Sequence, residues 1–203
     1  MMKLLSHPFS PYGRKVKMTL AMKGLKDKAE VITVDTNIPA NPEITAANPL
    51  AKIPALVLES GECMYDSAVI CEYLDSLTPS PQLFPKSGTE RWKVLTLAAL
   101  ADGILDAALL LVYEKRFRPE EKWHELWTDR QRTKIDRSLD FLEPNPPAWE
   151  ASPDYGHLTL AAALGYLDIR HEGKWRAGHP NLVVWLDRFA KAVPAFDETR
   201  PKQ

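Results

Sequence analysis

"NPLAKIPALVLESGECMYDSAVICEYLD", residues 48–75, is the stretch of this 203-residue chain that says most about its fold. Within it, "ALVLE" (55–59) and "ECMY" (62–65) are short apolar runs joined by a turn that contains serine and glycine, as in a β-hairpin. Apolar residues then recur at spacings of three and four, which is typical of an amphipathic helix, and Asp66 or Ser67 stands where a helix N-cap belongs. The stretch therefore predicts two paired strands followed by a helix.

The segment before this stretch adds two strands and a helix. "KLLSH" (3–7) and "EVITV" (30–34) are short and apolar or β-branched, as strands are. Between them, "PYGRKVKMTLAMKG" (11–24) has a helical pattern and ends on Gly24, a residue that commonly closes a helix. A short helix or loop precedes residue 48. The order of elements predicts a compact α/β module over residues 1–77.

The chain changes character after this module. Residues 78–87 are rich in proline and serine and read as a linker. Beyond it only helical patterns occur, so residues 88–203 are predicted to form an all-α domain built around one long helix. The four helical patterns cover residues 92–117, 123–143, 158–171 and 180–193.

Composition limits the kinds of partner. The chain has 26 Lys+Arg against 27 Asp+Glu, a formal net charge of -1, so no overall field attracts nucleic acid or an anionic membrane. No apolar run approaches the ~20 residues of a membrane span, and the opening lacks the apolar core of a secretory signal. Cys63 and Cys71 have neither redox-motif nor zinc-site spacing. We expect a cytoplasmic protein with reduced cysteines, no metal and a small ligand.

Ser10 opens the run "SPYGRKV" (10–16) between the first strand and the first helix. Pro11 fits the first helical position, where its missing N–H costs nothing. Taken alone, this pattern predicts a helix cap and no more. His7 lies close by, but no third group completes a Ser-His couple, so we interpret it as structural.

The motifs together resemble the cytosolic glutathione transferases, in particular their bacterial serine-type group. The resemblance rests on residues 10–16 and 48–75, and on "ADGILDAAL" (101–109) and "GYLDIR" (165–170) in the helical part. It implies a thioredoxin-like N-terminal domain that binds glutathione and an all-helical domain that offers a small hydrophobic electrophile. It also implies a homodimer in which glutathione is a co-substrate and no other cofactor is needed.

The same resemblance assigns roles to five residues. Ser10 is the catalytic residue, whose hydroxyl donates a hydrogen bond to the glutathione thiolate. Ile53 precedes Pro54, which is cis in the family and turns the backbone so that it pairs with the cysteinyl part of glutathione. Asp66 and Ser67, at a helix N-terminus, are expected to hold the γ-glutamyl ammonium and carboxylate. An ordinary strand-opening proline and an ordinary helix cap explain the same residues without a ligand.

Several charged residues are left open. Lys52 has the reach to meet the glycyl carboxylate of glutathione, but a solvated lysine is nearly as good an interpretation. Asp102 and Asp106 lie four residues apart on one face of the long helix, a position suited to lining the site. Arg14 and Lys15 are interpreted as part of a solvated helix face.

One feature departs from the family. The buried helix of its second domain usually opens with Ser or Thr and carries Asp three residues later, which together form a capping box. This chain has Thr159 and Ala162 there. We therefore expect a helix start weakened by about 1 kcal/mol, which Ala162→Asp should repair.

The predicted reaction is attack of the glutathione thiolate on an electrophile. Two alternatives stay open: reduction of peroxides by the same thiolate, and a non-catalytic glutathione-binding module of the stress response.

Overall fold

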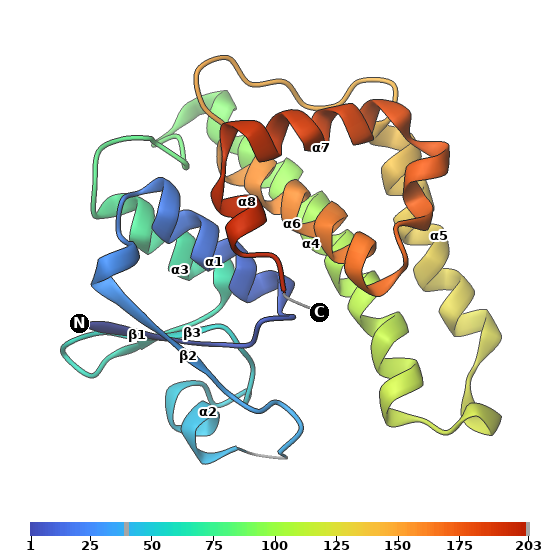
Figure 1. Ribbon diagram of the computed structural model, residues 1–203, viewed down its shortest axis with the longest axis horizontal. Coiled ribbons are helices and arrows are strands. Elements are labelled where there is room, and N and C mark those ends of the chain that lie inside the picture. The colour runs from blue at the N-terminus through green and yellow to red at the C-terminus, as the bar shows by residue number, and fades with distance from the viewer. Residues whose placement is uncertain (39–40, 202–203) are drawn as a thin grey trace. The chain divides into compact units, whose positions relative to one another are not determined.

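The computed structural model describes residues 1–38 and 41–201 (Figure 1). It divides into two compact units. The first comprises Met1–Pro85 with the C-terminal segment that begins at Val193, and the second comprises Lys86–Ala192. The sequence-based domains of 1–77 and 88–203 differ from this division, because most of the linker and the end of the chain pack with the first unit.

The first unit is built on a four-stranded mixed sheet in the order β2-β1-β3-β4. β1 pairs with β2 in parallel and with β3 antiparallel, and β3 pairs antiparallel with β4. All four predicted strands are present, each within a few residues of its expected bounds. The strands are β1 (Met2–Ser6), β2 (Ala29–Thr33), β3 (Ala55–Val57) and β4 (Cys63–Met64).

Helices cover both faces of this sheet (Figure 1). Leu4 and Leu5 point to opposite faces because successive strand residues alternate. Leu5 belongs to a core with α2 residues Ile44 and Ala47, whereas α1 and α3 pack against each other on the other face, where Leu4 is fully buried. The helices and 3-10 turns of this unit are α1 (Pro11–Met22), η1 (Lys26–Lys28), α2 (Pro42–Ala47), α3 (Ser67–Ser76) and α8 (Ala195–Glu198).

The C-terminal end of α1 is closed as the sequence predicts. Gly24 follows the helix with φ of +67°, a left-handed conformation that glycine adopts without strain. The Leu25 N–H then donates to the Leu20 carbonyl at 2.7 Å, which satisfies one of the last free helix carbonyls. The glycine thereby ends the helix and turns the chain toward β2.

A buried ion pair fixes the segment that follows α3. Lys23 Nζ lies 2.9 Å from Asp75 Oδ1 and also donates to the carbonyls of Thr78 and Pro81. Asp75 in turn accepts from the backbone N–H groups of Leu83 and Phe84. These bonds satisfy both buried charges, and so hold most of the predicted linker on the first unit.

The end of the chain is attached to α1 through Arg14. Its guanidinium carbon lies 4.1 Å from the centre of the Phe196 ring, and the side chain donates to the Phe196 carbonyl and to Thr199 Oγ1. Arg14 is 3% exposed and Lys15 is fully buried. The expectation that both belong to a solvated helix face is therefore wrong, because the last residues of the chain return to cover this part of α1.

The second unit is helical. α4 packs against both α5 and α6, and is the long central helix that the sequence predicts. α6 approaches α4 closely at Gly156, where an added Cβ would lie 2.9 Å from the Val94 carbonyl oxygen. The elements are α4 (Gly88–Phe117), η2 (Glu120–Lys122), α5 (Glu125–Leu142), α6 (Tyr155–Arg170), η3 (Lys174–Gly178) and α7 (Pro180–Ala192).

α4 is more apolar than expected from the sequence. Among the described residues it is one helix long and apolar enough to cross a membrane, with a mean hydropathy of 2.0 over 18 residues. The statement that no apolar run approaches this length is therefore wrong. The signal is weak evidence for a membrane span, because the core helix of a soluble protein meets the same criteria and 39% of this window is buried.

The start of α6 also differs from the expectation. The helix begins at Tyr155 with Asp154 as its N-cap, and Thr159 lies inside it, donating to the Tyr155 carbonyl at 2.8 Å. Asp154 Oδ1 accepts from the His157 N–H at 3.1 Å, and His157 Nδ1 accepts from the Asp154 N–H at 3.3 Å. This is a complete capping box with histidine in place of the usual Glu or Gln. The predicted weak helix start is therefore wrong.

Ala162, which the sequence suggested as the place to repair a cap, is fully buried. We now expect Ala162→Asp to lower the free energy of unfolding by roughly 3 kcal/mol or more, because it buries an unpaired carboxylate. Asp154→Ala should cost about 1–2 kcal/mol through loss of the cap. Asp136→Ala on the exposed face of α5 is the matched control and should be neutral or slightly stabilising. Urea denaturation measures all three, and a stabilised Ala162→Asp variant would contradict this helix start.

Candidate functional site

The strand register gathers the predicted site segments at one edge of the sheet. Leu5 pairs with Ala55, so Pro54 lies beside the C-terminal end of β1, from which the chain runs on to Ser10. Leu56 pairs with Met64, so the chain leaving β4 toward Asp66 runs to the same edge. Three segments distant in sequence thus meet because β3 is antiparallel to both its neighbours.

Ser10 is the N-cap of α1. Its Oγ accepts a hydrogen bond from the Gly13 N–H at 3.0 Å, and its own N–H donates to the His7 carbonyl at 3.0 Å. Pro11 occupies the first position of the helix, and the Ser10 side chain is half-buried. The hydroxyl therefore sits at the positive end of a 12-residue helix, a position that favours a neighbouring anion.

The entry to β3 carries the backbone turn that the family resemblance implies. The Ile53–Pro54 peptide bond is cis. Asn48, which was not among the predicted residues, is 2% exposed and holds the preceding loop: its amide donates to the Lys52 carbonyl at 2.9 Å and accepts from the Leu50 N–H at 3.0 Å. The Asn-Pro pair at 48–49 is a turn signal that could have pointed to it.

The start of α3 forms the third side of the site. Asp66 is the N-cap, with Oδ1 accepting from the Ala68 N–H at 3.0 Å, and the Tyr65–Asp66 peptide bond is also cis. Asp66 is exposed, whereas Ser67 is 3% exposed. Of the two predicted residues, Asp66 thus presents its side chain at the surface, while Ser67 contributes the first backbone N–H of the helix.

The remaining charged candidates are placed as follows. Lys52 is exposed just before Ile53, next to the site. Asp102 and Asp106 lie on α4 in the second unit, and their role remains a prediction. His7 Nδ1 accepts from the Phe9 N–H at 3.3 Å, which fits the structural role expected for it.

The charges on α1 near the site are positive. Burial lowers the pKa of Lys17 below its usual range, and the nearby Arg14 guanidinium lowers it further. α1 has no acidic residue in its first turn. The helix therefore offers an environment that favours a negative ligand atom over a proton.

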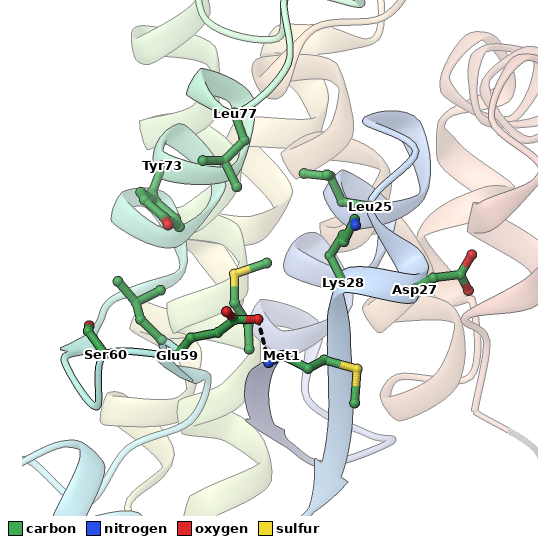
Figure 2. Close-up of a pocket in the computed structure, with 10 residues that line it drawn as sticks. Met1, Leu25, Asp27, Lys28, Glu59, Ser60, Tyr73 and Leu77 are labelled. Carbon is green, nitrogen blue, oxygen red and sulfur yellow. Dashed lines mark ion pairs between the residues drawn. The ribbon is translucent and has the colours of Figure 1, made fainter.

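One hollow of about 610 Å³ in the first unit lies away from these residues (Figure 2). Its lining includes Met1 and Met2 at the other end of β1, Glu59 and Ser60 beside them, and Tyr73 from α3. The Met1 ammonium and the Glu59 carboxylate form an ion pair across it. Because Ser10 follows the opposite end of β1, the hollow is no part of the site described above.

Within the described part of the chain, no group of three or more His, Cys, Asp or Glu side chains is arranged to hold a metal ion. The site instead combines two helix N-termini, a turned backbone edge and a hydroxyl. Such an arrangement suits an anionic, peptide-like ligand, since N–H groups bind carboxylates and a free backbone edge pairs with an extended chain.

Comparison with known proteins identifies this class of fold and site. The glutathione S-transferase N-terminal domain matches residues 9–77, and the C-terminal domain of the same family matches residues 125–188. The uncharacterized GST-like protein YibF of Escherichia coli K12 is 37% identical over 206 residues, which is 98% of each chain.

Two solved structures are similar over the full length of both chains. A glutathione transferase family member from Pseudomonas fluorescens Pf-5, with bound glutathione, is 42% identical with a TM-score of 0.93. A glutathione S-transferase from Methylobacillus flagellatus KT, with glutathione bound, is 35% identical with a TM-score of 0.91. The chain belongs to the glutathione S-transferase family, and its thioredoxin-like unit followed by a helical unit is the fold that the resemblance implied.

The loop before Pro54 depends on Asn48. We expect Asn48→Ala to lower the free energy of unfolding by about 1–3 kcal/mol, because it leaves the buried Lys52 carbonyl and Leu50 N–H without their partner. Asn48→Asp keeps the acceptor for Leu50 and loses the donor to Lys52, so it separates the two bonds. Urea denaturation measures both variants. Wild-type stability in Asn48→Ala would show that the loop is held by other contacts.

Proposed function

We propose that this protein binds glutathione at the edge of the sheet formed by β1, β3 and the start of α3, and activates its thiol for attack on small hydrophobic electrophiles. The observation that carries the proposal is the hydrogen bond from the Gly13 N–H to Ser10 Oγ. Because Ser10 Oγ accepts from the helix, its own hydrogen is left to donate to a sulfur atom. Ser10 then acts as both helix cap and thiolate donor.

The energetics of this role are modest. A thiol with a pKa near ~8.5 is only a few per cent thiolate at neutral pH, and the thiolate is the nucleophile. Lowering that pKa by about two units requires roughly 2.7 kcal/mol of preferential stabilisation of the anion. One charge-assisted hydrogen bond and a helix N-terminus together supply energies of this size. No side chain that accepts the proton is required.

The other residues of the site bind the rest of the tripeptide. The backbone at Ile53 and Pro54 pairs with the cysteinyl part of glutathione as an added strand. Asp66 binds the γ-glutamyl ammonium, and the N-terminus of α3, which Ser67 opens, binds the neighbouring carboxylate. Support comes from the relatives in Pseudomonas fluorescens and Methylobacillus flagellatus, both of which were solved with glutathione bound.

The reaction forms one bond from the glutathione sulfur to an electrophilic carbon. The electron pair comes from the thiolate and leaves with a departing group or moves into a polarised double bond, which then takes a proton. The helical unit provides the place for the electrophile. Since YibF of Escherichia coli is itself uncharacterized, the choice between conjugation, peroxide reduction and binding without turnover is left to assay. A panel that includes chlorodinitrobenzene and cumene hydroperoxide separates the three.

Ser10 variants test the proposal. Ser10→Ala should raise the pKa of bound glutathione by about two units and reduce conjugation at pH 6.5 strongly, while costing roughly 1 kcal/mol of stability through loss of the cap. Thiolate absorbance titration, a conjugation assay and urea denaturation measure the three effects. Ser10→Cys should move activity toward disulfide exchange, because a thiol at a helix N-terminus forms mixed disulfides with glutathione.

Equal thiol pKa values and equal conjugation rates in wild type and Ser10→Ala would reject the catalytic role and leave Ser10 a cap. Glutathione binding without turnover on the whole panel would favour the non-catalytic alternative. We also place the protein in the cytoplasm, where Cys63 and Cys71, both free in the structure, stay reduced.

The same proposal includes a homodimer. α4 keeps large apolar side chains at its surface, with Trp92 and Phe117 each 64% exposed, and such side chains favour association. Sedimentation of the purified protein at micromolar concentration should therefore give twice the mass of the chain. A monomer across a dilution series in this range would reject the dimer and leave the apolar residues of α4 to another partner.

A further inference from the structure

The last residue of β1 lies directly against the first turn of α1. Ser6 is 1% exposed, and it follows Leu4 on the face of the sheet where α1 packs. Gly13 is the α1 residue that meets it. A Cβ added to Gly13 would overlap Ser6 Oγ, would lie 3.3 Å from Ser6 Cβ and would lie 3.4 Å from Ser10 Cβ.

Gly13 is also the residue whose N–H donates to Ser10 Oγ at 3.0 Å. The Ser6 side chain therefore sets how closely the donor of this bond approaches the sheet. Its hydroxyl has no hydrogen-bond partner among the described protein residues, so the contact is one of shape. Glycine is not required here by backbone conformation, because φ of Gly13 lies outside the left-handed region, unlike that of Gly24.

We propose that Ser6 and Gly13 are a pair of positioning residues that fix the first turn of α1 against β1 and thereby aim the Ser10 hydroxyl at the glutathione sulfur. This inference rests on the catalytic role proposed for Ser10. Hydrogen bonds to a thiolate weaken steeply with distance and angle, so a shift of a few tenths of an ångström in the first turn changes how well the thiolate is stabilised. Neither Ser6 nor Gly13 touches the substrate in this role.

A volume exchange between the two positions tests the pair. Gly13→Ala should displace the first turn, raise the pKa of bound glutathione by about one unit and lower conjugation at pH 6.5 about tenfold. Ser6→Gly leaves a gap in the same place and should raise that pKa by a smaller amount. The double variant Ser6→Gly/Gly13→Ala returns one side chain to the contact, since the nearest remaining atom is Ser10 Cβ at 3.4 Å, and should restore both values.

Two controls separate positioning from general effects on helices and stability. Gly103→Ala places a Cβ in open space on the exposed side of α4, so it adds helix propensity without a clash and should leave the thiol pKa unchanged. Glutathione affinity, measured by calorimetry, should stay within about twofold in every variant, because the tripeptide is held by β3 and α3. If Gly13→Ala does not fold, Ser6→Gly and the double variant still test the pair.

The outcomes distinguish this inference from the proposed function. A raised pKa in Ser10→Ala with a wild-type pKa in Gly13→Ala and Ser6→Gly would overturn the pair and leave the function of Ser10 standing. A wild-type pKa in Ser10→Ala would overturn the proposed function and, with it, the pair. Effects of Gly13→Ala that Ser6→Gly fails to reverse would also reject the pair, because they would come from Gly13 alone.

Discussion

The antiparallel pairing of β1 with β3 is the constraint on which the site depends. It sets Leu5 opposite Ala55 and so brings the cis Ile53–Pro54 bond beside the end of β1. The hairpin from β3 to β4 then returns the chain to the same edge, where α3 begins. A slip of one residue would turn Leu4 and Leu5 to the wrong faces, so the two cores on either side of the sheet hold the register.

At that edge the fold places two helix N-termini, each capped by its own side chain. Ser10 and Asp66 satisfy backbone N–H groups that would otherwise lack partners, and the positive ends of α1 and α3 both favour anions. Stability and ligand binding therefore draw on the same groups. A family of enzymes that must hold a thiolate and a carboxylate obtains both sites from the way its helices start.

Contacts far from this edge hold α1 in place. Arg14 attaches the C-terminal segment to the helix through Phe196, and Lys23 joins its other end to Asp75. The sequence led us to expect solvent around Arg14, because a charged residue near a helix start is usually exposed. Its burial depends on a segment some 180 residues away, which no local pattern reports. The misplaced start of α6 has a similar cause, since His157 completes the capping box only through its ring geometry.

The sequence by itself determined the order of strands and helices, the cap at Ser10, the end of α1 at Gly24 and the family resemblance. These features follow from periodicity and capping chemistry, which act between residues close along the chain. The tertiary structure alone decided that Asn48 holds the loop before Pro54, that Gly13 must meet Ser6, and that the end of the chain belongs with the first unit. Each of these depends on which surfaces come together in space, and packing at that scale leaves no repeat in the sequence.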